Sequence, residues 1–383
     1  MSLKTDNGPA VTLSIVIPCF NEARTVESCI ETVLAIQDAD LRLQLIVVDD
    51  HSTDRSADIV EKLAARHTEI VLLRHDVNRG KGAALRTGIA RATGDFVAIQ
   101  DADLEYDPQD LKRLVGVLRL GVADVVMGSR FLSHGYHRVL YFWHSVGNRL
   151  LTLLSNMLTD LNLSDMETCY KVFKREVIQS LDLKEDRFGF EPEVVAKIAH
   201  QGLRIYEMGI SYRGRTYAEG KKIGLKDAWR ALYCILHYNL PLASVGIQLA
   251  FYTLAGGIAA VVNLVAFLTL FYAGAGTTVS VLTAFFLAAA VNYGLSIAFI
   301  FRHRIRYSAV LEMLIFLGAI AVIGWLDLLL TRRALDASWS PAVAKLGASA
   351  IILLLNFAVR RYIVFPQKVS ADWKPQNPGS GAH

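Results

Sequence analysis

The stretch VAIQDADLEYDP, residues 97–108, changes within a few positions from an apolar run to a segment with four carboxylates. Its first residues have the nearly continuous apolar character of a strand that is covered on both faces. Asp107 and Pro108 have the composition of a helix N-cap and first helical position. The stretch therefore predicts a buried strand, an acidic segment at its carboxyl end, and a helix that follows directly.

The same alternation extends over the first 240 residues of the chain. The strand-like runs are LSIVIP (13–18), LIVVDD (45–50), IVLLRH (70–75), FVAIQD (96–101) and DVVMGS (124–129). Helical patterns lie between them at 22–36, 54–67, 82–92 and 108–120, with Asn21 and Ser52 or Thr53 as start signals. Alternation of this kind predicts an α/β fold with an open, mostly parallel sheet.

The residues at the strand ends are the candidates for ligand binding, because such sheets bind ligands beyond the carboxyl ends of their strands. In chain order they are Pro18, Cys19, Phe20, Asn21 and Glu22; Asp49 and Asp50; Asp76; Asp101, Ala102 and Asp103; and Gly128, Ser129 and Arg130. Most of these ends carry an acid, which predicts a divalent cation, since Mg²⁺ and Mn²⁺ prefer carboxylate oxygens together with substrate phosphates.

Asp101 and Asp103 are the expected metal ligands, and Glu105 extends the set. The alternative is an acidic turn that caps the next helix, a role that fits Asp107. NRGKGAALRTG (78–88) is not a P-loop, because GxxxxGK[ST] is absent. Lys81 at this helix start could still approach a nucleotide's ribose or phosphates, with a plain tight turn as the alternative.

The second half of the chain is almost uninterruptedly apolar. Apolar residues make up 53% of the chain, with a mean hydropathy of +0.34, and they concentrate at 246–271, 279–301, 309–330 and 342–364. Each stretch is long enough to cross a hydrocarbon core of about 30 Å. They predict an all-α transmembrane domain of four helices over residues 242–368, followed by a flexible tail at 369–383.

Basic residues predict the orientation of this domain. RHRIR (302–306) follows the second span, and Arg360, Arg361 and Lys368 lie at the end of the fourth. This pattern predicts that both termini and the α/β domain lie in the cytosol, at a plasma or inner membrane. Arg332 and Arg333, which follow the third span, favour the opposite orientation.

Two further patterns concern the membrane. NYGLSIAFIF (292–301) and NFAVRRYIVF (356–365) echo one another and predict two helix hairpins derived from one unit. Asn292 and Asn356 are expected to join helices rather than to bind ligand. Residues 137–158 and 224–241 predict amphipathic interfacial helices, for which a buried core helix is the alternative.

Charge and cysteine content exclude several classes. The net charge of +4 is too small and scattered for nucleic-acid binding. Four cysteines without CxxC spacing fit a reducing cytosol, and the N-terminus lacks an apolar core of signal-peptide length.

The motifs together resemble the family-2 glycosyltransferases of the GT-A fold. IVIPCFNEA, VVDDHSTD, NRGKGAALRTG and DADLEYDP follow that family's order and spacing. GSRF, DMETCYKVFKREV, GFEPEVVAKIA and GRTYAEGKKIG are similar to the polyprenyl-phosphate glycosyltransferases, the group that includes dolichol-phosphate mannose synthase. The resemblance covers residues 13–225 and implies a cytosolic GT-A domain over 1–223. The membrane half resembles the GtrA-like four-helix domain.

The resemblance also implies roles for individual residues. Nucleotide contacts fall on Pro18, Phe20, Glu22 and Asp50, with Asp49, Asp76, Lys81 and Ala102 at the neighbouring strand and helix ends. The resemblance assigns the metal and the donor diphosphate to Asp101, Asp103 and Glu105. The family often has Gln at the position of Glu105. Phosphate contacts fall on Arg130, Arg215 and Lys221, with Arg149 and Lys222 as further cationic candidates. Asp165 and Glu167 are expected near the sugar, the alternative being loop acids before the strand-like CYKVF.

The expected function is an inverting transfer of one sugar from GDP-mannose or a UDP-hexose to dolichyl or undecaprenyl phosphate. The acceptor oxygen is already anionic, so the site needs a cationic clamp such as Arg130 or Arg215 rather than a general base. A processive polysaccharide synthase is an alternative, but the QxxRW motif of those enzymes is absent. A nucleotidyltransferase is disfavoured, because IPCFNEA stands where such an enzyme has a glycine-rich segment after its first strand. Another alternative function is a lipid-sugar flippase or scaffold with an inactive transferase domain. The chain could also form a homo-oligomer.

Overall fold

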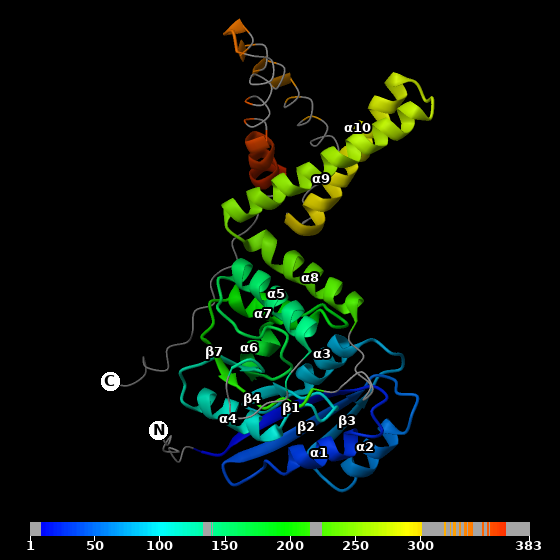
Figure 1. Ribbon diagram of the computed structural model, residues 1–383. Coiled ribbons are helices and arrows are strands. Elements are labelled where there is room, and N and C mark those ends of the chain that lie inside the picture. Colours follow the sequence, from blue (N-terminus) through cyan, green and yellow to red (C-terminus); the bar gives the residue numbers. More distant parts are fainter. Residues whose placement is uncertain are drawn as a thin grey trace, which may run out of the picture. The chain divides into compact units, whose positions relative to one another are not determined.

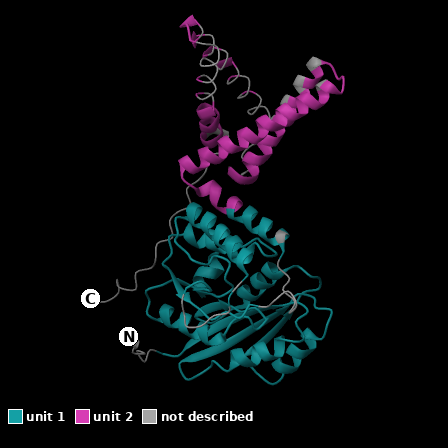
Figure 2. Ribbon diagram, viewed as in Figure 1, with its two compact units in different colours: residues 1–235, 372–383 teal, residues 236–371 magenta. Residues whose placement is uncertain are grey.

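The computed structural model describes residues 9–132, 139, 141–214 and 224–300, together with some residues between 318 and 364, of which 353–364 form the longest segment. The chain divides into two compact units (Figure 2): residues 1–235 with 372–383, and residues 236–371. The first unit contains the sheet, and the second contains the long apolar helices.

The first unit is built on a seven-stranded sheet with the order β3-β2-β1-β4-β6-β5-β7 (Figure 1). Its strands are β1 (Val11–Cys19), β2 (Leu41–Asp49), β3 (Ile70–Arg74), β4 (Phe96–Ile99), β5 (Val125–Ser129), β6 (Lys171–Lys174) and β7 (Ile205–Gly209). All pairs are parallel except those of β6, which runs antiparallel between β4 and β5. The expected mostly parallel α/β sheet is confirmed.

Helices cover the sheet, as the continuous burial of its strands requires. Leu13 to Ile17 of β1 and Leu45 to Asp49 of β2 are all buried, so side chains on both faces are covered. The helices are α1 (Val26–Leu34), α2 (Ser56–Ala64), α3 (Lys81–Arg91), α4 (Pro108–Arg119), α5 (Phe142–Thr159), α6 (Arg175–Ser180), α7 (Phe190–Ala199) and α8 (Leu225–Asn239). Of these, α3 packs on β1 and β2, and α4 packs on β5 and β6.

The helix starts agree with the sequence at one place and differ at two. Asp107 caps α4, accepting a hydrogen bond from the Gln109 backbone N–H at 3.0 Å, as predicted. Asn21 does not start a helix: it lies in the left-handed region with φ +55. Its side chain instead accepts from the Thr53 N–H at 2.8 Å, so it joins the turns after β1 and β2. Consequently α1 and α2 begin later than predicted, at Val26 and Ser56.

The two segments predicted to lie at a membrane surface are helical. In α8, Cys234 and Ile235 are buried while Trp229 is 70% exposed. In α5, Trp143 is 79% exposed, but the buried face is largely polar and includes Asn148. Both helices are therefore amphipathic, and their place at a membrane surface stays a prediction.

The second unit contains η2 (Leu240–Leu242), α9 (Val245–Tyr272) and α10 (Thr277–Leu295), followed by the π-helical segments η3 (Ser296–Ile300) and η4 (Arg360–Val364). Within the described residues, one helix, Val245–Leu270, is long and apolar enough to cross a membrane. The expected span at 309–330 lies largely outside the described residues, and that at 342–364 is described only at 347, 351 and 353–364, so the number of four stays a prediction.

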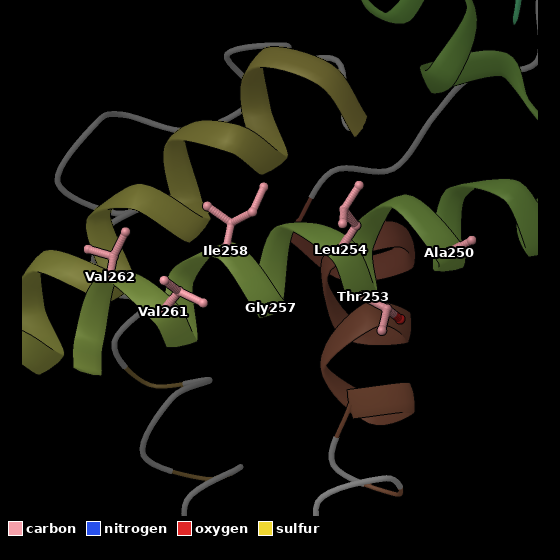
Figure 3. A pocket seen from close by; sticks show the side chains of 7 residues that line it. All are labelled: Ala250, Thr253, Leu254, Gly257, Ile258, Val261 and Val262. Carbon is pink, nitrogen blue, oxygen red and sulfur yellow. The ribbon is translucent and has the colours of Figure 1, made fainter. Parts of the chain in front are cut away.

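Two local features of this unit are a hydrogen bond of Asn292 and an apolar recess on α9. Asn292 accepts a hydrogen bond from Ser296 Oγ at 3.3 Å, one turn along its own segment. The hydrogen bonds between helices that were expected for Asn292 and Asn356 stay predictions. One side of α9 carries a shallow apolar recess around Gly257 (Figure 3), lined by Ala250, Thr253, Leu254, Gly257, Ile258, Val261 and Val262. A surface of this kind on α9 suits contact with lipid or with another helix.

Candidate active site

The carboxyl ends of β1, β2 and β4 meet at one edge of the sheet. The three strands are neighbours and parallel, and the backbone N–H of Asp50 donates to the Cys19 carbonyl at 2.8 Å. Asp101 joins the same region, because the Cys29 thiol contacts its carbonyl oxygen at 3.6 Å. The strand order turns from β1 to β4 here, which is the switch point where such sheets bind ligands.

Asp50 holds the backbone in front of α3. Its carboxylate accepts from the N–H groups of Arg79 at 2.9 Å and Gly80 at 2.7 Å, and it contacts His75 Nδ1 at 2.7 Å. The side chain is almost fully buried. These contacts give Asp50 a structural role, and its predicted contact with a ribose stays a prediction.

The other nucleotide candidates differ in how accessible they are. Asp49 is buried, and its Oδ1 has no hydrogen-bond partner among the described residues. Phe20 is 40% exposed and Asp76 is exposed, whereas Ala102 is buried. Pro18 and Glu22 are partly buried, and Glu22 accepts from the Thr25 hydroxyl at 3.0 Å. Their shared edge of the sheet is shown, and their contacts with a nucleotide stay predictions.

Lys81 bridges the acidic segment and α7. Its Nζ lies 2.9 Å from Asp101 and 3.0 Å from Glu191, and its side chain is 17% exposed. Burial lowers the pKa of Lys81, but the carboxylates of Asp101 and Glu191 raise it by more, so the pKa lies well above its ordinary value. Lys81 therefore places a permanent positive charge against Asp101.

The glycines around Lys81 have a packing cause. A Cβ on Gly80 would lie 2.4 Å from the Asp186 carbonyl oxygen, and one on Gly82 would lie 2.2 Å from the Glu185 carbonyl oxygen. The Ala83 N–H donates to Asp186 at 3.1 Å. The glycine pattern thus lets the backbone at 185–186 lie directly against the start of α3.

The acidic segment divides between separate partners. Asp101 pairs with Lys81, and Glu105 accepts from the Tyr212 hydroxyl at 2.7 Å. Asp103 accepts from the Glu105 N–H at 3.2 Å. Within the described part of the chain, no group of three or more His, Cys, Asp or Glu side chains is arranged to hold a metal ion.

The donor chemistry of this segment nevertheless fits a hard divalent cation. Asp101, Asp103 and Glu105 are partly exposed carboxylates, and oxygen ligands of this type suit Mg²⁺ and Mn²⁺. The position of Lys81 Nζ against Asp101 shows that the segment already takes a cation. Glu105 would have to exchange its Tyr212 contact to act as a third ligand.

Arg130 and Asp165 form a buried ion pair. Nε and Nη2 of Arg130 donate to the two carboxylate oxygens of Asp165 at 2.6 and 2.7 Å, and Asn148 donates to Asp165 at 3.2 Å. The exposed fractions of the Arg130 and Asp165 side chains are 9% and 0%. Burial raises the pKa of Asp165, but Arg130 lowers it by more, so the net shift is downward and the pair is ionised.

Neighbouring groups fix this pair in place. The Tyr212 ring lies 5.2 Å from the guanidinium carbon of Arg130. Glu207 on β7 accepts from the backbone N–H groups of Ser164 and Asp165 at 3.0 and 3.1 Å. Arg130 and Asp165, which were predicted separately as a phosphate and a sugar contact, are therefore brought together, with Glu207 of β7 and Asn148 of α5 as supports.

Glu167 is a partly buried acid on which the charges of this pair act. Its Oε1 is buried without a hydrogen-bond partner among the described residues. Burial, followed by the charge of Glu191, raises the pKa of Glu167 to about 7. Lys171, fully buried nearby, donates to the Met166 carbonyl at 3.1 Å. Glu167 can thus change protonation near neutral pH.

The remaining cationic candidates are less well placed by the structure. Arg149 is exposed on α5, with its guanidinium carbon 5.8 Å from the Phe131 ring. Arg215, Lys221 and Lys222 lie outside the described residues, and their roles stay predictions. Among the four cysteines, all buried and free, Cys169 is packed in the core.

Several residues that support the site were not among those predicted from the sequence. Glu191, Asn148, Tyr212 and Glu207 each hold a predicted residue or its backbone. Glu191 lies in the quoted motif GFEPEVVAKIA, which was a usable signal. The other three have no local pattern, because each partner is at least 17 positions away.

The chain belongs to glycosyl transferase family 2: the model of that family matches residues 14–182. The model of the GtrA/DPMS transmembrane domain matches residues 251–365. The chain thus combines a GT-A-type catalytic domain with a membrane domain of this second family.

Individual relatives agree with this assignment. An uncharacterized glycosyltransferase of Mycobacterium tuberculosis, Rv0539, is 34% identical over 59% of this chain and 99% of its own length. The low-salt glycan biosynthesis hexosyltransferase Agl6 of Haloferax volcanii is 33% identical over 62% of this chain. Glycosyltransferase AglD of the same organism is 29% identical over 55% of this chain. The match spans 56% of Agl6 and 36% of AglD.

Among solved structures, glucosyl-3-phosphoglycerate synthase from Mycobacterium tuberculosis in complex with Mn²⁺, uridine diphosphate and glucosyl-3-phosphoglycerate is similar at a TM-score of 0.48. The two chains are 22% identical, and the alignment covers 60% of this chain and 80% of that one.

Proposed function

We propose that this glycosyltransferase moves a single sugar from a nucleotide-sugar donor to a polyprenyl phosphate. The observation that carries the proposal is the acidic edge at the β1/β4 switch point, with the Arg130–Asp165 pair in the same unit. The same chain carries a GtrA/DPMS transmembrane domain. A soluble acceptor would not require such a domain, whereas a lipid acceptor keeps the reaction at a membrane.

The donor binds at the edge formed by Pro18 to Glu22, Asp49 and Asp101 to Glu105. Asp101, Asp103 and Glu105 would hold a divalent cation, which when bound supplies Lewis-acid stabilisation of the leaving diphosphate. Lys81 orients Asp101, because its Nζ is held between Asp101 and Glu191 by two ion pairs. Glu167 would exchange a hydrogen bond with a sugar hydroxyl, a role supported by its Oε1, which has no described hydrogen-bond partner.

The acceptor phosphate binds to the cationic side of the site. Arg130 is held by Asp165 and Asn148 in one orientation, so its guanidinium is preorganised for an anion. The phosphate oxygen attacks the sugar from the face opposite the leaving diphosphate, which inverts the anomeric centre. Since that oxygen is already anionic, no side chain has to take up a proton.

The proposed location is a plasma or inner membrane, with the catalytic unit and both termini in the cytosol. The span at Val245–Leu270 and the exposed Trp229 on α8 support it. GDP-mannose and UDP-hexoses are the donor candidates, and dolichyl and undecaprenyl phosphate the acceptor candidates.

The proposal is tested by incubating the purified full-length chain with each radiolabelled nucleotide-sugar, Mn²⁺ or Mg²⁺, and either undecaprenyl or dolichyl phosphate. The expected product is a lipid with one hexose on its phosphate, identified by mass spectrometry of the organic extract. A polymer would instead support the processive synthase. The absence of product with every donor and both polyprenyl phosphates would support the flippase or scaffold.

A further inference from the structure

Tyr212 connects the acidic segment with the Arg130–Asp165 pair. Its hydroxyl donates to Glu105 Oε2 at 2.7 Å, and its ring lies 5.2 Å from the guanidinium carbon of Arg130. Burial and then the charge of Glu105 raise the pKa of Tyr212, and Arg130 lowers it by less, so the hydroxyl keeps its proton. One residue thus donates to a proposed metal ligand while its ring faces the proposed phosphate ligand.

The surroundings hold the Tyr212 ring in place. Tyr212 is 6% exposed, and its ring packs against that of Tyr106 with 5.2 Å between the centroids. Tyr106 in turn stacks on Tyr170 at 4.7 Å. The backbone is held as well, because residues 106 and 212 form a β-bridge and the Arg213 N–H donates to the Glu105 carbonyl at 2.8 Å. The Tyr212 hydroxyl therefore cannot follow the Glu105 carboxylate when that side chain turns.

Binding of a cation would require such a turn of Glu105. Glu105 is partly exposed, and it would give up its contact with Tyr212 to act as a third ligand beside Asp101 and Asp103. A buried hydroxyl that loses its acceptor costs free energy until it finds another. Arg130, a partly exposed cation beside the same ring, attracts anions to this place. A phosphate held by Arg130 would therefore supply the new acceptor.

We propose that Tyr212 couples the cation site to the acceptor site by changing its hydrogen-bond partner. Its hydroxyl donates to Glu105 while the cation is absent, and to the phosphate at Arg130 once Glu105 has become a ligand. Each of the two ligands then raises the affinity for the other, because a coupling free energy between two sites is reciprocal. The identification of the anion as the polyprenyl phosphate acceptor rests on the proposed function.

The first measurement is Mn²⁺ binding to the full-length chain in detergent without lipid, by electron paramagnetic resonance of the free ion. Tyr212→Phe keeps the ring but removes the competing hydrogen bond, so Mn²⁺ should bind roughly tenfold more tightly than to wild type. The matched control is Tyr106→Phe, which removes a hydroxyl from the neighbouring ring whose described contact is with the Cys169 N–H at 3.3 Å. It should bind Mn²⁺ as wild type does.

The second measurement is binding of undecaprenyl phosphate by native mass spectrometry, with and without saturating Mn²⁺. Mn²⁺ should raise the affinity of wild type for the lipid, and this enhancement should be roughly tenfold smaller in Tyr212→Phe. Tyr212→Phe should thus gain affinity for Mn²⁺ and lose Mn²⁺-dependent affinity for the lipid. A purely structural role of Tyr212 would instead weaken the binding of both ligands.

Three results would overturn the proposal. One is a Mn²⁺ affinity of Tyr212→Phe equal to that of wild type or weaker, and another is an unchanged enhancement of lipid binding. The third comes from Glu105→Ala, which removes the carboxylate and must also reduce the enhancement; an enhancement as large as that of wild type would refute the exchange even if Tyr212→Phe failed to fold. An equal enhancement for inorganic phosphate would overturn the lipid as the anion.

The two binding measurements separate this proposal from the proposed function. Neither requires sugar transfer, and the Mn²⁺ measurement requires no lipid. A chain that shows both effects of Tyr212→Phe but transfers no sugar would refute the proposed function alone. A chain that transfers sugar but shows neither effect would refute the role of Tyr212 alone.

Discussion

The Arg130–Asp165 pair offers a quantitative test of the site's construction. Replacing Arg130 by Met leaves Asp165, which has no exposed surface, with the Asn148 amide and the backbone N–H of residue 130 as its described partners. Removing one member of a buried ion pair costs about 3–5 kcal/mol. For a folded unit of this size, that corresponds to a fall in Tm of roughly 6–20 °C. Arg130→Met/Asp165→Leu removes both charges and should recover most of the lost stability.

The assay is thermal unfolding of the full-length chain in detergent, with sugar transfer measured on the same samples. Both variants should lose transfer, because neither has a guanidinium for the acceptor phosphate. The pH dependence has a defined sign. Arg130 holds the pKa of Asp165 below its ordinary value, so the pair's stabilisation is present above the unfolded-state pKa and is lost as the pH falls through the folded one. The stability gap between wild type and Arg130→Met should therefore shrink in acid.

Two results would refute this reasoning. A loss below about 1 kcal/mol for Arg130→Met would mean that the pair behaves as an exposed one. A double variant as unstable as the single one would mean that Arg130 acts through packing rather than through the charge of Asp165.

Three further predictions concern the neighbourhood of α3 and Glu167. Gly82→Ala should destabilise the chain, because its Cβ would lie 2.2 Å from the Glu185 carbonyl oxygen. The control Gly116→Ala in α4, whose Cβ would have nothing within 4 Å, should stabilise the chain by about 1 kcal/mol in the same thermal assay. Equal effects of the two substitutions would contradict the packing role of Gly82. Lys81→Met should lower Tm by exposing the repulsion of Asp101 and Glu191, and Mn²⁺ should raise Tm more in the variant than in wild type; an identical Mn²⁺ shift would count against a cation at Asp101. Glu167→Gln should be more stable than wild type at pH 8 but not at pH 5. Folding raises the pKa of Glu167 to about 7, so the wild-type protein loses stability as the pH rises from the unfolded-state pKa through the folded-state pKa. A stability difference that does not change with pH would exclude this titration.

The sequence predicted what depends on local pattern. The strand ends at 18–22, 49–50 and 101–103 could be placed together because parallel neighbours share one edge. Asp107 could be identified as a cap because the capping residue and Pro108 are adjacent. The repeat between 292–301 and 356–365 was visible because both copies keep the same spacing.

Contacts between residues that are far apart along the chain could not be predicted from the sequence. Arg130 and Asp165 were each predicted as binding residues, but their pairing depends on a loop held by β7, a strand without a continuous apolar run. The glycines around Lys81 read as a ligand-binding turn, while their cause is a backbone about 100 residues away. The hydrogen bonds of Asp50 with the Arg79 and Gly80 N–H groups could not be predicted either, because those residues follow a different strand.

The most direct test of the central claim compares Asp103→Asn with Asp107→Asn in the transfer assay. Both substitutions remove one charge from the same acidic segment, but Asp103 is a proposed metal ligand and Asp107 is the cap of α4. The account predicts that Asp103→Asn abolishes formation of the lipid-linked sugar while the protein still inserts into the membrane, and that Asp107→Asn keeps most activity, since Asn also caps helices well. Unchanged lipid-linked product from Asp103→Asn would contradict it.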